Sequence, residues 1–286
     1  MIETASPPRT AATPLVVQRR RSIAANLHAA FSIAAYVFLY APILILVLFS
    51  FTTDAFGARL TGFTFNWYAQ LLDDKRLVSA TLNTLQVGIV STIVSTALGT
   101  TMALAMERFR FRGRTGVDAL LYLPVVIPEI VMALSLLAFF AFAFQILEGL
   151  FNISLRNGLA TVIISHIAFS ISFVVIVVRA SLQGFDRRLE EAAQDLGANE
   201  WQTFWRVTFP IILPGIIGGA LLAFTISLDD FVISFFTTGP GVNLLPIEVY
   251  SQVKRSITPK INAISTLMLL VSMTLVLLSQ AVQRKR

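Results

Sequence analysis

The sequence has no cysteine, and among its 286 residues there are only two histidines, His28 and His166. Without thiols the chain can form neither a disulfide framework nor a Cys-ligated zinc or iron–sulfur site. Two imidazoles are too few for a histidine-rich metal centre. No metal ligand is therefore predicted for this chain.

Charge is also scarce. Charged residues make up 13% of the chain, against roughly 25% in soluble domains, and a soluble globule needs more charge than that to cover its surface. Hydrophobic residues make up 56%, which excludes a disordered chain. The composition indicates an integral membrane protein whose charges are confined to its loops.

Long runs without charge predict six membrane spans. A helix needs roughly 20 apolar residues to cross a bilayer, and the ten-residue alternation of barrel strands is absent. Two of the runs contain exceptions, which are Glu129 in one and Asp229 with Asp230 in the other. We therefore predict an all-α membrane protein with six transmembrane helices, near 30–51, 81–106, 119–144, 158–178, 211–237 and 261–282.

The basic residues predict the orientation. Fifteen of the 22 Lys and Arg lie in segments that would share one side of the membrane, 1–29, 107–118, 179–210 and 283–286. Because positive charge gathers on the cytoplasmic side, we expect a cytoplasmic N-terminal tail (1–29), a transmembrane domain (30–282) and a cytoplasmic C-terminus (283–286). These charges suit lipid headgroups, and no nucleic-acid partner is expected.

Two predicted helices carry small residues at intervals of four. The second has Ser91, Ser95, Gly99 and Ala103, and the fifth has Gly215 and Gly219. Small residues at this spacing let helix backbones approach closely in lipid. We interpret both sets as helix-packing positions.

The inner segment 179–210 predicts two short helices joined by a turn. Asp186 is a suitable N-cap, residues 187–196 are good helix formers, and Gly197 can adopt the left-handed conformation that ends a helix. A second helix is expected from Asn199 to Phe209, closed by Pro210. On physical grounds alone, a solvated connector remains an alternative.

This segment resembles the EAA loop of ABC importer permeases. Glu191, Ala192 and Ala193 are followed at the family's spacing by Gly197 and by Val207-Thr208-Phe209-Pro210, where the family pattern ends in Ile-x-Leu-Pro. The resemblance implies the type I importer permease fold. It also implies that Glu191, Ala192, Ala193 and Gly197, in the loop 186–210 that ends at Pro210, contact an ATPase subunit and transmit its closure.

The chain has no recognisable site for ATP. A P-loop requires a lysine after a glycine, and none of Lys75, Lys254, Lys260 and Lys285 follows one. We expect no cofactor on this chain, with ATP and Mg²⁺ used by a separate ATPase, so the chain itself is not an enzyme.

The three acids inside the spans are candidates for a substrate path. A carboxylate at mid-bilayer costs roughly 2.5–3.5 kcal/mol and is usually functional, although Glu129 could also be protonated or bonded to neighbouring helices. Pro124 and Pro128 predict a break directly before Glu129. Adjacent helical residues point about 100° apart, so only one of Asp229 and Asp230 should face a central path, and the other should cap a helix break or bond a neighbour.

The segments around these acids resemble polyamine (spermidine/putrescine) permeases, most closely the second permease subunit of those systems. The resemblance rests on Pro128-Glu129-Ile130-Val131, on residues 227–241 with Leu245-Pro246, and on 258–263, and with the EAA loop it covers roughly residues 30–280. Carboxylates and aromatic faces suit ammonium groups, and this region offers Phe231 and Phe235 beside the acids. The expected substrate path is Glu129, Asp229, Asp230, Phe231 and Phe235.

The predicted function is thus the permease subunit of an ATP-driven importer in a bacterial inner membrane, most simply for polyamines. The resemblance implies a second permease subunit, an ATPase dimer and an extracytoplasmic solute-binding protein as partners. An importer of the same architecture for another organic solute, such as an opine, is the main alternative. A stand-alone ion-coupled transporter would not need the EAA loop, and an intramembrane enzyme lacks a catalytic set.

Overall fold

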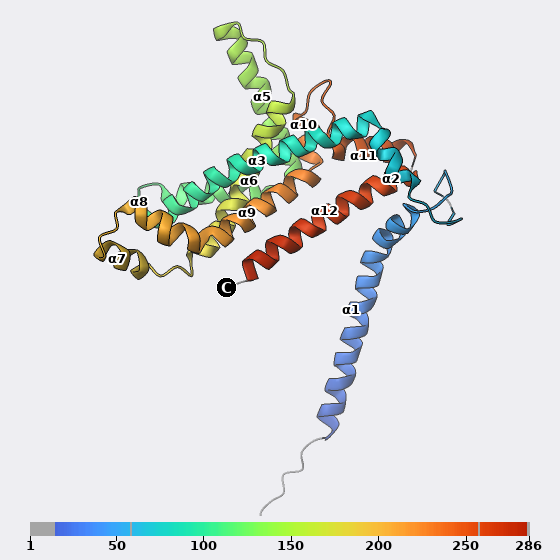
Figure 1. Cartoon of the computed structure of the whole chain (residues 1–286), viewed down its shortest axis with the longest axis horizontal. Coiled ribbons are helices and arrows are strands. Elements are labelled where there is room, and N and C mark those ends of the chain that lie inside the picture. The colour runs from blue at the N-terminus through green and yellow to red at the C-terminus, as the bar shows by residue number, and fades with distance from the viewer. Residues whose placement is uncertain (1–14, 58, 257, 285–286) are drawn as a thin grey trace, which may run out of the picture. The chain divides into compact units, whose positions relative to one another are not determined.

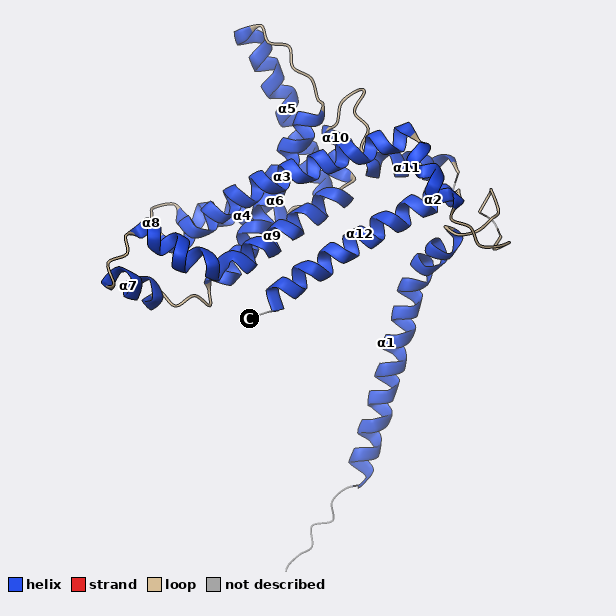
Figure 2. Cartoon of the chain, viewed as in Figure 1, coloured by secondary structure: helices blue, strands red, loops and turns tan. Residues whose placement is uncertain are grey.

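The computed structural model describes residues 15–57, 59–256 and 258–284, and all regular elements in these ranges are helices (Figure 1, Figure 2). Residues 1–14 of the predicted N-terminal tail and residues 285–286 of the predicted C-terminus lie outside the described residues. The helices agree with the predicted all-α class.

The helices follow one another along the chain with short connections. They are α1 (Leu15–Phe49), α2 (Asn66–Asp73), α3 (Lys75–Arg108), α4 (Arg114–Val126), α5 (Glu129–Phe151), α6 (Leu159–Leu182), α7 (Arg188–Asp195), α8 (Glu200–Thr203), the π-helix η1 (Phe204–Thr208), α9 (Phe209–Asp229), α10 (Val232–Thr237), α11 (Leu245–Arg255) and α12 (Pro259–Arg284).

Six described segments are long and apolar enough to cross a membrane, in agreement with the six predicted spans. They are Ala25–Phe49, Lys75–Arg108, Glu129–Phe151, Leu159–Leu182, Glu200–Asp229 and Pro259–Ala281. The third span is not the single helix expected over 119–144, because the chain breaks between α4 and α5. The fifth reaches back to Glu200 and ends at Asp229, before the predicted limit at 237.

The predicted break before Glu129 is confirmed, and the two prolines explain it. Pro124 lies in the last turn of α4, and Pro128 is the residue from which α5 starts. A proline donates no backbone hydrogen bond and disfavours helical geometry in the residue before it. Glu129 therefore begins a new helix instead of lying within a continuous one.

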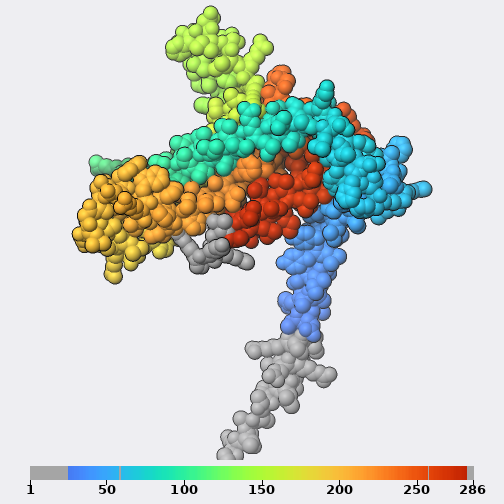
Figure 3. Space-filling model, in the orientation of Figure 1, coloured from blue at the N-terminus to red at the C-terminus, as the bar shows by residue number. Residues whose placement is uncertain are grey.

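The chain forms two units, the first ending at Phe49 and the second starting at Ser50. In the second unit α3, α6 and α9 pack against one another, and α12 packs on α9 (Figure 1). α6 is the central helix, and 56% of the residues in its most apolar 18-residue stretch are buried. α5 is only 11% buried by the same measure, and its outer part stands clear of the bundle (Figure 3).

Small residues lie where the central helices cross. A Cβ atom built on Gly215 of α9 would fall 2.0 Å from the Ser181 Oγ of α6, and one on Gly219 would lie 3.5 Å from the Cα of Val174. Ser91, Ser95, Gly99 and Ala103 of α3 are all buried. The contact between α6 and α9 therefore has no room for a side chain at Gly215.

The second helix of the inner segment differs from the prediction. It begins after Asn199 as expected, but it does not close at Pro210, because α8 leads through the π-helix η1 directly into α9. Pro210 lies in the first turn of α9, directly after the π-helix η1, where the hydrogen-bond pattern of the helix changes. The docking segment and the fifth span are thus one helical run.

Candidate functional site

The inner segment forms the predicted pair of helices. α7 ends at Asp195, and Gly197 follows with φ of +89°, the left-handed conformation that glycine adopts without strain. The side chain of Asn199 accepts a hydrogen bond from the Gln202 N–H at 2.8 Å and so caps α8. The predicted N-cap Asp186 is one residue off, because Arg187 precedes α7 directly, but the Asp186 side chain accepts a hydrogen bond of 3.0 Å from the N–H of Arg188, the first residue of α7.

A polar clamp fixes α7 to the inner end of α3. The clamp is Arg108, Glu190 and Thr208, in which both Arg108 and Thr208 donate hydrogen bonds to the Glu190 carboxylate. Arg187 adds a hydrogen bond of 2.9 Å from its guanidinium to the Glu107 carbonyl oxygen. Because Thr208 belongs to η1, the clamp joins α7 and η1 to the end of α3, which lies 82 residues before Glu190 and 100 residues before Thr208 in the sequence.

The loop presents exposed apolar groups away from the clamp. Leu196 is 90% exposed and Trp201 is 70% exposed. A hollow of about 310 Å³ lies beside them, lined in part by Ala193, Gly197 and Val207. Glu191 and Ala192 are exposed as well. Exposed apolar side chains around a hollow are typical of a surface that receives a partner protein.

Asp230 lies in the second break of the fold, between α9 and α10. Its Oδ1 accepts a hydrogen bond of 2.9 Å from the Ile233 N–H and so caps α10. Among the described residues no donor reaches its Oδ2 with hydrogen-bond geometry, and the nearest ring nitrogen, His166 Nε2, is 3.5 Å away, although Asp230 is only 6% exposed. The carboxyl group of Glu129, at the start of α5, lies close enough to interact with it. Two helix breaks thus bring two acids together from segments a hundred residues apart.

His166 supports this break from α6. The ring is 2% exposed, its Nδ1 lies 3.1 Å from the Ser227 hydroxyl, and its Nε2 lies 3.1 Å from the Ser234 hydroxyl. Nε2 is also 3.5 Å from Asp230 Oδ2. This role of His166 was not predicted from the sequence. Its position inside a charge-free span was the available signal, since such residues are seldom without function.

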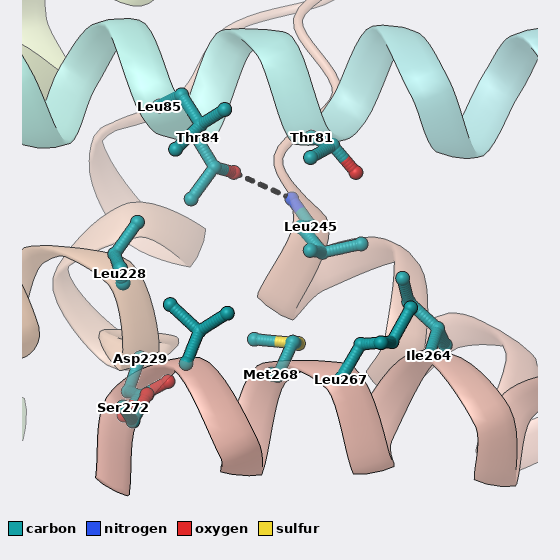
Figure 4. A pocket seen from close by; sticks show the side chains of 11 residues that line it. Thr81, Thr84, Leu85, Leu228, Asp229, Leu245, Ile264, Leu267, Met268 and Ser272 are labelled. Atoms are coloured by element: carbon teal, nitrogen blue, oxygen red, sulfur yellow. Dashed lines mark hydrogen bonds between the residues drawn. The ribbon is translucent and has the colours of Figure 1, made fainter. Parts of the chain in front are cut away.

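Asp229 points to a different part of the bundle. It lies at a cavity of about 230 Å³ that is lined mostly by apolar side chains from α3, α9, α11 and α12. Figure 4 shows its carboxylate next to Ser272 of α12, while Leu267 and Met268 line the floor. The two adjacent acids therefore lie in separate surroundings, because α9 ends at Asp229 and Asp230 has an extended backbone; one of the two caps a helix break, as expected.

Aromatic rings line a groove beside the Asp230 break. The ring of Phe231 lies 5.4 Å from that of Phe235 and 4.5 Å from that of Tyr250 in α11, measured between centroids. The groove has a volume of about 610 Å³ and also includes Ile130, the residue after Glu129. The sequence predicted Phe231 and Phe235 for the substrate path. Tyr250 was not predicted, because it belongs to a helix outside the predicted spans.

Ion pairs fasten the opposite end of the bundle from the clamp. Arg76 contacts the buried Glu248 of α11 at 2.8 Å. The Asp74 carboxylate caps α3 by accepting hydrogen bonds from the backbone N–H groups of Arg76 and Leu77, at 3.1 and 3.2 Å, and it also accepts a hydrogen bond from Lys260. The hydrogen bond from Lys260 is the main cause that lowers the pKa of the Asp74 carboxyl.

Comparison with known proteins agrees with this architecture. Residues 95–286 match the family described as binding-protein-dependent transport system inner membrane component. The chain belongs to this family. It is therefore a multi-pass permease subunit of an ABC importer in the inner membrane, and ATP hydrolysis belongs to a separate subunit, as the missing P-loop predicted.

Two relatives and one solved structure are similar to this chain over most of its length. It is 39% identical to the spermidine/putrescine transport system permease protein PotC of Haemophilus influenzae over 90% of this chain and 96% of the relative. It is 39% identical to the putrescine transport system permease protein PotI of Escherichia coli over 82% of each chain. A bacterial alginate importer shares the fold with a TM-score of 0.74 and 20% identity, covering 96% of this chain and 99% of that one.

Proposed function

We propose that this permease carries polyamines such as putrescine and spermidine across the inner membrane. The observation that carries the proposal is the pair Glu129 and Asp230, in which a buried carboxylate oxygen without a hydrogen-bond partner adjoins an aromatic groove. An ammonium group needs a carboxylate and an aromatic face. The names of the two relatives support the same solute class.

The residues of the path have distinct roles in this proposal. Glu129 and Asp230 accept the ammonium groups, and Phe231 and Phe235 cover the methylene segments between them. Asp229 lines a second, more apolar chamber of the same path. The alkyl spacers of a polyamine suit both the aromatic and the aliphatic walls.

The inner segment couples the path to ATP hydrolysis. In the proposal, Glu191, Ala192, Ala193 and Gly197 contact the ATPase, and Pro210 marks the point where the docking segment enters α9. The exposed Leu196 and Trp201 and the hollow beside Gly197 support this assignment. The complete importer would contain a second permease subunit, an ATPase dimer and an extracytoplasmic solute-binding protein.

The predicted topology belongs to the same proposal. The tail 1–29, the C-terminus 283–286 and the loop 186–210 face the cytoplasm, and the domain 30–282 spans the membrane. The basic residues of these inner segments support this orientation. The Asp230 break then lies on the outer side of the fifth span.

Uptake by the reconstituted importer tests the solute. Proteoliposomes with the permease, its partner subunits and the solute-binding protein should accumulate radiolabelled putrescine or spermidine only when ATP is enclosed with the ATPase. An opine added in excess should not compete. Accumulation of the opine without accumulation of either polyamine would replace the proposed solute and leave the family assignment intact.

A further inference from the structure

Lys254 lies on the aromatic wall of the groove. Its Nζ is 4.8 Å from the centre of the Tyr250 ring, one helical turn away in α11. Tyr250 in turn contacts the ring of Phe231 in a tilted arrangement, with 4.5 Å between the ring centroids, and Phe231 follows Asp230 directly in the sequence. A cation within about 6 Å of a ring centre is attracted by the electrons of that ring. The wall that borders the two acids therefore already holds one ammonium group.

Arg255, the neighbouring positively charged residue of the groove, has different contacts. Arg255 donates hydrogen bonds to the Ser251 hydroxyl at 2.8 Å and to the Ser251 carbonyl oxygen at 3.3 Å. Among the described residues, no carboxylate forms an ion pair with Lys254. Arg255 is thus fixed by its own helix, while the contact that the structure gives the ammonium of Lys254 is the aromatic ring.

The chemistry of this contact matches the solute class. A lysine side chain carries a primary ammonium at the end of four methylene groups, and putrescine consists of the same four methylenes with an ammonium at each end. The contact between Lys254 and the Tyr250 ring is therefore an example of an aminobutyl group bound in this groove. A free diamine can bind to this ring only after the aminobutyl group of Lys254 has moved away from it.

We propose that Lys254 is a specificity-determining residue that acts as a tethered competitor: its aminobutyl group occupies the Tyr250 subsite until an ammonium group of the solute displaces it. The inference rests on the proposed polyamine function. It assigns Tyr250 to the solute site and predicts that solutes lacking an alkylammonium group fail to open the groove. Simple repulsion by a positive charge at the groove is the competing explanation, and it does not require Tyr250.

Equilibrium binding separates the two explanations. Radiolabelled putrescine is titrated onto the purified permease complex without the solute-binding protein, because that protein would otherwise dominate the measured affinity. Lys254→Met keeps the apolar stem and removes the ammonium. A contact of this kind is worth about 0.5–1 kcal/mol at an exposed site, so Lys254→Met should bind putrescine about two- to fivefold more tightly than the wild type.

Two further variants make the measurement specific. Arg255→Met removes a positive charge from the same groove without removing a contact to Tyr250, and it should leave the affinity within about twofold of the wild type. Tyr250→Leu should weaken binding and should also abolish the gain from Lys254→Met, because competitor and solute then have no ring to share.

The outcomes are distinguishable from failure of the proposed function. A gain from Lys254→Met that persists in the Tyr250→Leu background, or an equal gain from Arg255→Met, would overturn the tethered competitor and leave polyamine transport standing. An unchanged putrescine affinity in Lys254→Met would likewise overturn the tethered competitor and leave polyamine transport standing. A wild-type complex that neither binds nor takes up a polyamine would overturn the proposed function and the inference together.

Discussion

The inner and outer ends of the helix bundle use charge in opposite ways. At the inner end, Glu190 is paired with Arg108, and Asp118 is paired with Arg179 at 2.5 Å, while large apolar side chains are exposed. At the Asp230 break, the acids Glu129 and Asp230 have no Lys or Arg within ion-pair distance in the described residues. Aromatic rings line a groove there, together with Ile130, Val232 and Ile247.

This difference indicates two tasks. Paired charges hold short helices in a fixed position, and exposed apolar groups give a partner protein something to bury. A buried acid without a fixed cation, such as Asp230, is costly unless a mobile cation or a proton reaches it, whereas Glu129 is exposed. This contrast supports the proposed division of tasks, in which the end with the clamp receives a partner protein and the end with the Asp230 break receives a positively charged solute.

The largest effect should come from the turn at the inner end. Gly197→Asp places an L-residue at φ of +89°, which costs about 1–2 kcal/mol, and it adds a negative charge next to the hollow. We expect uptake to fall about tenfold or more, with the protein still in the membrane. Gly184→Asp is the matched control, since Gly184 is exposed in the same segment and lacks a positive φ. Normal uptake and normal ATPase pull-down by Gly197→Asp would contradict the docking assignment.

The second effect tests the outer end. Asp230→Asn retains an oxygen that can accept from the Ile233 N–H, so the α10 cap survives while the charge is lost. A charged hydrogen bond is worth about 1.5–3 kcal/mol, and we expect polyamine uptake to fall about tenfold or more. Asp229→Asn, at the mouth of the other cavity, should reduce uptake only about twofold to threefold. Equal losses in the two variants would remove the distinction between these neighbouring acids.

Changes in the clamp should have a smaller effect, which concerns the coupling of transport to ATP hydrolysis. Glu190→Gln loses the charge that holds Arg108 and Thr208, and we expect about two- to fivefold less solute carried per ATP hydrolysed. The exposed Glu191 makes none of these clamp contacts, so Glu191→Gln should instead weaken capture of the ATPase subunit. Exchanging the partners, with Arg108→Glu and Glu190→Arg together, should restore part of the coupling. Identical behaviour of both glutamine variants would show that the clamp has no separate role.

The smallest effect concerns stability. Asp74→Asn keeps a cap for α3 but weakens the pair with Lys260, and we expect the free energy of unfolding to fall by about 0.5–1 kcal/mol at neutral pH. Because the folded pKa of Asp74 lies below its ordinary value of 3.8, this contribution is present at neutral pH and is lost as the pH falls through the lowered pKa. Thermal unfolding of wild type and variant should therefore converge in acid. A gap that is the same at both pH values would assign the loss to another cause.

The sequence predicted the parts of this architecture that depend on local chemistry. Charge-free runs located the spans because lipid excludes charge, and Pro124 and Pro128 located the break before Glu129 because a proline lacks the N–H of a helix. Gly197 marked the end of α7 for a similar local reason. The inner loop could be identified because its residue spacing is itself the signal.

Features that depend on packing were not predictable. The directions of Asp229 and Asp230 are set by the neighbours α5, α6 and α12, so the sequence could say only that they differ. Tyr250 joins Phe231 through a contact between helices that are separate in the chain. The helical run through Pro210 depends on the π-helix η1, for which the sequence carries no recognised signature.

That run has a mechanical consequence. From Glu200 to Asp229 the chain is helical over 30 residues, which corresponds to about 45 Å. In the proposed docking, one end of this helical run carries the loop that contacts the ATPase, and the other end stops at Asp230. A displacement of the loop is then transmitted along the run to Asp230, and the run can bend at two places, the π-helix η1 and Pro214 inside α9.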